Sequence, residues 1–176
     1  IQRESTLHLV QRLRGNPLKN GNIDSYMTSG LTRGAYYLDE DVTISQSLKV
    51  SGDVTLDLNG HVLKYENVQT PGSPLAVESG GHLTIKDSNS NATHKFKHSD
   101  GLWVLNEENG SETVTGGGIT GGTGYPYQLS STVNCGGGVY IAPGGQLTMT
   151  GGNIIGCSAE YGGGVCIYPK RDGEQG

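Results

Sequence analysis

Positive charge, aromatic side chains and long apolar runs are all scarce in this 176-residue sequence. It has 12 Lys and Arg against 17 Asp and Glu, and the net charge of −5 argues against a basic face that binds nucleic acid. No apolar run approaches the roughly 18 residues of a membrane span, so none is expected in this sequence. The 30 glycines do not follow a strict three-residue period, which excludes a collagen.

The cysteine and glycine patterns give no reason to expect a cofactor or a metal ion. The three cysteines, Cys135, Cys157 and Cys166, are odd in number, and their spacing matches no zinc motif. At least one thiol is therefore unpaired, and one disulfide is open to the chain if it is exported. The glycine runs contain neither a phosphate-binding loop nor the calcium-binding nonapeptide repeat.

The most informative feature that is present is an internal repeat. Residues 135–141 recur as residues 161–167, and both copies contain GGGV followed by one residue and Ile. Residues 115–121 recur as 150–156 after a longer interval, and we assign the surplus to a loop at 124–127. Residues 80–85 recur as 144–149. A period of about 26 residues, the interval between the first two copies, indicates a solenoid in which each repeat stacks on the next.

Several short runs alternate apolar and polar residues, as half-buried strands do. The clearest are 42–44, 48–50 and 54–58. In the last of these, Thr55 and Asp57 separate a valine and two leucines, which puts the apolar residues on one face. The sequence thus predicts an all-β fold of parallel coils, with Val139 beside Val165. An antiparallel sandwich is the alternative, but it does not account for the repeat.

Two stretches of the repeat region resemble known families. Residues 54–63, VTLDLNGHVL, resemble the first coils of right-handed parallel β-helix proteins of the pectate-lyase-like class. The GGGVYI and GGQLTMTGGNIIG segments are similar to repeats in large surface proteins of gut bacteria and, more loosely, in polymorphic outer-membrane proteins. The resemblance covers most of residues 34–170. It implies a right-handed parallel β-helix that is secreted or exposed on a cell surface.

The first fifteen residues, IQRESTLHLVQRLRG, resemble the C-terminal end of ubiquitin. This resemblance implies a remnant of a ubiquitin-like domain at 1–15, whose interaction residues form an apolar patch and a tail. The patch residues are Leu7, His8 and Val10, and the tail residues are Arg12, Leu13, Arg14 and Gly15. Asn16 stands where ubiquitin has its terminal glycine, and Pro17 follows it, so conjugation or release by ubiquitin enzymes is not expected.

The remaining sequence divides into a connecting segment and the repeats. Residues 16–33 are predicted to be a linker or a cap whose apolar residues cover the open end of the stack, namely Ile23, Tyr26, Met27 and Leu31. Residues 34–176 carry the repeats. The sequence begins at Ile1 and ends soon after a repeat begins, so we interpret it as a fragment of a longer chain.

An insertion at 86–112 interrupts the repeat pattern. It holds the only Phe and the only Trp of the sequence, and we interpret His94, Phe96, His98 and Trp103 as a ligand-binding loop. The alternative is that the aromatic residues pack the loop onto the stack. Residues 91–108 are the one stretch of the repeat region where a helix is not disfavoured, and a helix would put His94 and His98 on one face.

No set of acidic residues predicts a catalytic centre. Asp53 and Asp57 flank one strand, but from residue 113 onward the only acids are Glu160, Asp172 and Glu174. Turn acids such as Asp57 are expected to cap corners of the backbone. We therefore assign no catalytic residue, although the enzymatic status stays open.

Three functions are consistent with these features. The first is a non-catalytic surface or adhesion-type β-helix that binds glycans or host proteins. The second is a fragment of a carbohydrate-active β-helix enzyme, a polysaccharide lyase or glycoside hydrolase, whose acidic groove lies elsewhere. The third is a ubiquitin-like mimic or modifier that recruits ubiquitin-binding proteins.

Overall fold

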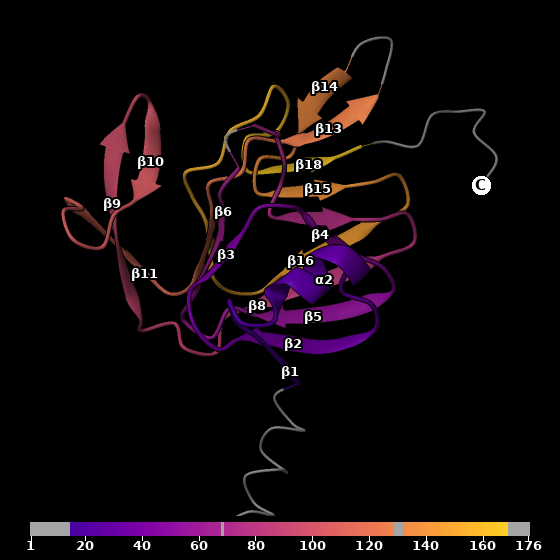
Figure 1. Cartoon of the computed structure of the whole chain (residues 1–176), viewed down its shortest axis with the longest axis horizontal. Helices are drawn as coiled ribbons and strands as arrows, with labels where there is room; N and C mark the ends of the chain where they lie inside the picture. The colour runs from indigo at the N-terminus through magenta and orange to yellow at the C-terminus, as the bar shows by residue number, and fades with distance from the viewer. Residues whose placement is uncertain (1–14, 68, 129–131, 169–176) are drawn as a thin grey trace, which may run out of the picture.

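The computed structural model describes residues 15–67, 69–128 and 132–168. Strands dominate it, and the described residues contain one helix. The described residues form an all-β structure with three short parallel sheets and two small antiparallel ones. In Figure 1 the parallel strands lie in tiers, from the indigo N-terminal strands at one end to the yellow C-terminal strands at the other.

Sheet A is the widest of the three parallel sheets. Its strand order is β1 (Asn16–Leu18), β2 (Gly34–Leu38), β5 (Asp53–Asp57), β8 (His82–Lys86) and β16 (Gln146–Met149). Every pair of neighbours in this sheet is parallel. Parallel neighbours require a connection that returns the chain to the same end of the sheet, and here the other two sheets supply it.

Sheets B and C contain four parallel strands each. Sheet B has the order β4 (Leu48–Val50), β7 (Leu75–Val77), β15 (Val139–Ile141) and β18 (Val165–Ile167). Sheet C has the order β3 (Val42–Ile44), β6 (Val62–Tyr65), β12 (Gly118–Thr120) and β17 (Asn153–Ile154). Along the chain the strands visit sheets A, C and B in turn, and this order occurs four times from β2 to β18.

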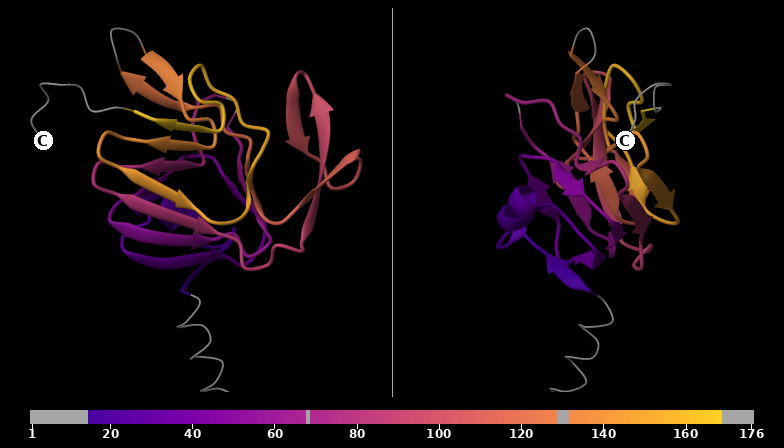
Figure 2. Two further views of the ribbon diagram at one scale, coloured as in Figure 1. Left: turned by 180° about the vertical axis from the view of Figure 1, so that it is seen from behind. Right: turned by 90° about the vertical axis from the view of Figure 1, so that its right-hand side faces the viewer.

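The strand register follows the sequence repeats. Val139 pairs with Val165, as the recurrence of 135–141 at 161–167 predicts. Gly118 pairs with Asn153, which matches the recurrence of 115–121 at 150–156. The match between 80–85 and 144–149 is also confirmed, because β8 and β16 are paired neighbours. Figure 2 shows the paired strands from behind as successive tiers.

The core lies between the three parallel sheets and is built from rows of aliphatic side chains. In sheet B, one row places Val50, Val77 and Ile141 side by side, and all three are fully buried. The row ends at Ile167, which is 66% exposed. Threonines at the alternate positions of sheet A form a row on the outer face, as the alternation predicts: Thr55, Thr84 and Thr148.

The segment predicted to be a linker or cap, residues 16–33, packs onto the core. It contains β1 and helix α2 (Ile23–Ser29), which packs against β3 and β4, the first strands of their sheets. Ile23 and Leu31 are buried, and Tyr26 and Met27 pack against the core cluster. These residues therefore cover one end of the stack, and a short helix forms where the sequence indicated irregular structure.

The insertion forms an antiparallel sheet rather than a helix. Its strand order is β10 (Leu102–Leu105), β9 (Thr93–Ser99) and β11 (Glu112–Thr115). Asp100 and Gly101 have positive φ angles, 52° and 83°, and turn the chain between β9 and β10. The helix considered for residues 91–108 is therefore wrong, because His94 and Phe96 follow the two-residue period of a strand that is buried on one face.

The loop predicted at 124–127 is also wrong. Strand β13 (Tyr125–Gln128) pairs with β14 (Thr132–Cys135) in an antiparallel hairpin. The ring of Tyr125 stacks on that of Tyr140 in sheet B, with 4.8 Å between their centroids. This contact gives the hairpin an apolar surface to pack on, which the local turn residues do not reveal.

Among the described residues, no helix has the length and apolar character that crossing a membrane requires.

Replacing Ile119 tests whether the buried rows hold the fold. Ile119 lies between Leu63 and Ile154 in sheet C and is fully buried. Ile119→Ala should lower the free energy of unfolding by about 2–5 kcal/mol, measured by denaturant titration, because it leaves a cavity. Thr148→Ala, at an exposed position of β16, should change it by less than about 0.5 kcal/mol. Equal losses in the free energy of unfolding for the two variants would contradict the assignment of Ile119 to a buried row and of Thr148 to the outer face.

Candidate functional sites

Most of the interaction residues predicted from the resemblance to ubiquitin lie outside the described residues. These are Leu7, His8, Val10, Arg12, Leu13 and Arg14. The structure describes the tail only from Gly15, which has a φ of 98°. A Cβ at Gly15 would clash with the carbonyl of Ala35, so this residue lies directly against β2.

Asn16 continues this contact as the first residue of β1. It pairs with Tyr36, and its side-chain amide donates to the Ala35 carbonyl at 3.5 Å. The bond between Asn16 and Pro17 therefore lies within a paired strand. A protease that cleaves extended tails would need to detach β1 first, which adds to the sequence argument against release after Asn16.

The structure separates the four residues of the predicted ligand loop into two pairs. His94 and Phe96 are buried, at 7% and 1% exposure. His98 and Trp103 pair across β9 and β10, and their rings meet edge to face with centroids 5.2 Å apart. Packing accounts for His94 and Phe96, and His98 and Trp103 remain the exposed residues of the predicted ligand loop.

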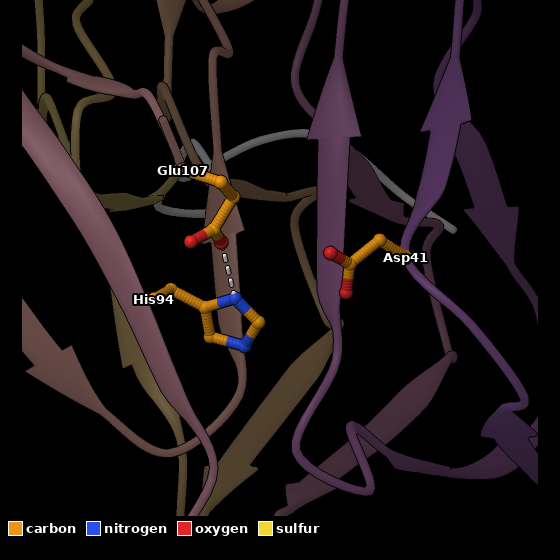
Figure 3. A group of neighbouring side chains, drawn as sticks. All are labelled: Asp41, His94 and Glu107. Atoms are coloured by element: carbon orange, nitrogen blue, oxygen red, sulfur yellow. Dashed lines mark hydrogen bonds and ion pairs between the residues drawn. The ribbon is translucent and has the colours of Figure 1, made fainter. Parts of the chain in front are cut away.

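His94 joins the insertion to the main stack. Its Nδ1 lies 2.7 Å from Oε1 of Glu107, and its Nε2 lies 2.7 Å from the carbonyl oxygen of Gly60 in the turn between β5 and β6. The second oxygen of Glu107 accepts a hydrogen bond from the backbone N–H of Lys95. Figure 3 shows the imidazole facing Glu107, with Asp41 on the side of the stack.

These contacts define the charge of His94. A carboxylate and a carbonyl can only accept hydrogen bonds, so both ring nitrogens must donate and the ring is the imidazolium. Burial acts to lower the pKa of His94, but the hydrogen bonds to Gly60 and Glu107 and the charge of Asp41 outweigh it and raise the pKa above its usual value. The buried charge is thus fully hydrogen-bonded.

The same residues are the one group in the described chain with the distances of a metal site. One ligand atom from each of Asp41, His94 and Glu107 lies within 4.8 Å of the others. A metal ion needs a deprotonated ring nitrogen, whereas both nitrogens of His94 face acceptors at hydrogen-bond distance. Asp41 also has other partners, accepting from the Val62 N–H at 2.8 Å. These distances fit a protonated His94 that joins Glu107 to the Gly60 carbonyl better than they fit a metal centre.

Two aspartates at the corners of the stack bind backbone N–H groups. Asp57 accepts from the N–H groups of Asn59 and Ser88, both at 2.9 Å, and pairs with Lys86 at 3.1 Å. Asp87 accepts from Gly60 at 2.7 Å and from Gly117 at 2.8 Å. The prediction that turn acids cap corners is confirmed for Asp57. These carboxylates connect consecutive tiers and are occupied by structural hydrogen bonds.

Acidic residues are rare in the described strands of the parallel sheets. Their strands contain two acidic residues, Asp53 and Asp57, which belong to β5 and lie about 13 Å apart at the usual rise of a strand. Glycosidase carboxylates are about 5–10 Å apart. In the neighbouring tier, Asp53 faces His82 and Asp57 faces Lys86 rather than another acid. Among the described residues, the strand acids are therefore not arranged for acid and base catalysis.

One cleft was not predicted from the sequence. It measures about 580 Å³ and lies between the end of α2, the turn between β3 and β4, the loop after β6, and β13. Hydroxyl and amide side chains line it with two tyrosines, and Lys49 is the one charged residue among them. Gln46, Ser47 and Lys49 have no side-chain hydrogen bond or ion pair to any other described residue. No local motif could reveal a cleft built from four separate segments.

A smaller and more apolar cavity lies beside Trp103. It measures about 190 Å³ and separates β10 from the outer side of sheet C, where Lys64 and Thr120 line it. Leu102, Trp103 and Val104 are each between 37% and 45% exposed. The backbone of β10 contacts Gly156 closely, because a Cβ there would clash with the Trp103 carbonyl.

Comparison of the chain with protein-family models, curated proteins and solved structures found no match.

The charge of His94 predicts a pH-dependent stability. Because its pKa is raised on folding, the contribution is complete below about pH 6.5 and is lost as the pH rises through the folded-state pKa. The chain should be more stable than His94→Gln at about pH 5, by about 1.5 kcal/mol since Glu107 is half exposed, and the difference should shrink by about pH 9. Denaturant titration at both pH values measures it.

His98→Gln is the matched control for this prediction. His98 is exposed, lies in the same strand, and makes no hydrogen bond comparable to those of His94. Its replacement should leave the pH dependence as it is in the parent chain. A stability difference for His94→Gln that is the same at both pH values would contradict the imidazolium assignment.

Asp87 provides a separate test of the corner contacts. Asp87→Ala leaves the N–H groups of Gly60 and Gly117 without an acceptor, which should cost about 1–3 kcal/mol for each group. Asp39→Ala is the control, because Asp39 is exposed at the end of another strand. Thermal unfolding compares the two, and a melting temperature of Asp87→Ala equal to that of Asp39→Ala would refute the role of Asp87.

Proposed function

We propose that the chain from residue 34 onward is a right-handed parallel β-helix that serves as a non-catalytic surface or adhesion module of a secreted or cell-surface protein. The repeated visit to sheets A, C and B supports this architecture, since one strand from each sheet makes one coil. The short strands gain their stability from the coils on either side, which produces a stiff, elongated unit.

One observation carries the non-catalytic part of the proposal. The strand acids in the described sheets are too far apart to act as a pair, and the buried one, Asp57, is held by Lys86 and by backbone N–H groups. Burial acts to raise the pKa of Asp57, but these hydrogen bonds outweigh it and lower the pKa. A carboxylate with a lowered pKa and these partners is suited to holding a turn rather than to exchanging a proton.

Glycans are the ligand class that best suits the large cleft. Hydroxyl and amide groups can donate to and accept from sugar hydroxyls, and an aromatic ring supplies an apolar contact for the sugar face. Gln46 and Ser47 offer such groups, Lys49 adds a hydrogen-bond donor, and Tyr125 also lines the cleft. The stacking of Tyr125 on Tyr140 fixes that ring before a ligand arrives.

The test compares binding with turnover. The immobilised chain is screened against neutral and acidic oligosaccharides, and the Gln46→Ala, Lys49→Ala double variant should weaken the strongest interaction about tenfold or more, which corresponds to about 1.4 kcal/mol. Lys97→Ala, at an exposed position of β9, is the control. The same oligosaccharides should keep their chain length after prolonged incubation. Cleavage of any of them, or binding unaffected by the double variant, would overturn the proposal.

A further inference from the structure

Two cysteines from different tiers meet on the outer face of sheet B. Cys135 ends β14, and Cys166 is the middle residue of β18. Cys135 forms a parallel bridge with Tyr161, and Tyr140 pairs with Cys166. Both cysteines belong to a second apolar cluster, with Ala76 and Tyr140 at its centre, beneath the β13–β14 hairpin.

A tight turn of the backbone places Cys135 there. The next residue, Gly136, has a φ of 64°, and a Cβ at this position would clash with the carbonyl of Val139 and approach the Cα of Tyr140. The chain therefore folds back over the start of β15. Gly162 has a φ of 61° at the equivalent point of the next repeat, so both repeats make the same turn.

Cys166 packs against the apolar cluster that contains Cys135. Cys135 is buried, whereas Cys166 is partly exposed. Cys157 has different neighbours, since its sulfur contacts the carbonyl oxygens of Ile119 and Ile155. The geometry therefore selects one pair of the three that the sequence allows.

We propose that Cys135 and Cys166 form a disulfide bond when the folded chain meets a disulfide oxidant such as oxidised glutathione. The Cys166 thiol, the more exposed one, loses its proton and attacks one sulfur of the oxidant, which forms a mixed disulfide and releases one glutathione thiolate. The Cys135 thiol then loses its proton and attacks the Cys166 sulfur, which releases the second glutathione. Two thiols are oxidised, and one oxidant disulfide is reduced to two thiols.

The bond would fasten the β13–β14 hairpin to strand β18. It would close a loop from residue 135 to residue 166 that contains β15, β16 and β17, and so restrict the unfolded chain. Burial, with the neighbouring Cys166 thiol and Glu160, raises the pKa of Cys135 to about 11. Because the thiolate is the attacking species, the second step should be slow near neutral pH and faster in alkaline solution.

The experiment uses the full chain in a glutathione redox buffer. Free thiols are then blocked by alkylation, and peptide mass mapping identifies the linked cysteines. The expected product joins Cys135 to Cys166 and leaves Cys157 alkylated. Oxidation should raise the melting temperature by roughly 5–10 °C, and dithiothreitol should reverse the rise.

Two variants separate the proposed bond from other oxidation products. Cys157→Ser should behave like the parent chain, and Cys166→Ser should lose the rise in melting temperature while remaining folded, because residue 166 is partly exposed. Glutathione adducts without a Cys135–Cys166 link, a bond that includes Cys157, or an unchanged melting temperature would overturn the proposal. The saccharide screen does not depend on this bond, so the two proposals fail independently.

Discussion

Parallel pairing between strands one tier apart is the interaction on which the rest of this structure depends. A strand of three residues such as β15 has too few hydrogen bonds and too little apolar surface to persist alone. Val139 contacts one neighbour on each side, Leu75 and Val165, so the same residue completes two ladders. The core, the outer threonine row and the corner contacts all follow from this register.

The corners show how charge is used in a chain with few charged residues. Asp87 bridges two tiers through Gly60 and Gly117, and Gly60 also gives its carbonyl to His94. The N–H group of Gly60 thus donates to a carboxylate, and its carbonyl accepts from an imidazolium. Both polar backbone groups of this turn residue are therefore hydrogen-bonded. Asp57 and Asp87 therefore act on the backbone of the fold.

The repeats could be predicted from the sequence because each ladder demands the same side-chain pattern in every tier, and the pairing of Val139 with Val165 needed no other information. The strands of the insertion could not be predicted, because the spacing of His94 and His98 also fits a helix. Only the pairing of β9 with β10 and β11 distinguishes a strand from a helix there. The large cleft was missed because Lys49 and Tyr125 are far apart in sequence and carry no motif.

The two antiparallel excursions have a further consequence. The stretch of chain from Leu83 to its ladder partner Leu147 is roughly twice as long as the stretch from Val54 to its own partner Leu83. For flexible connections, such a doubling adds only about 0.6 kcal/mol to the entropic cost of closure, because that cost grows with the logarithm of length. The length of chain inserted at the corners therefore has little effect on the free energy of ladder pairing. New surface can be added there without changing the core.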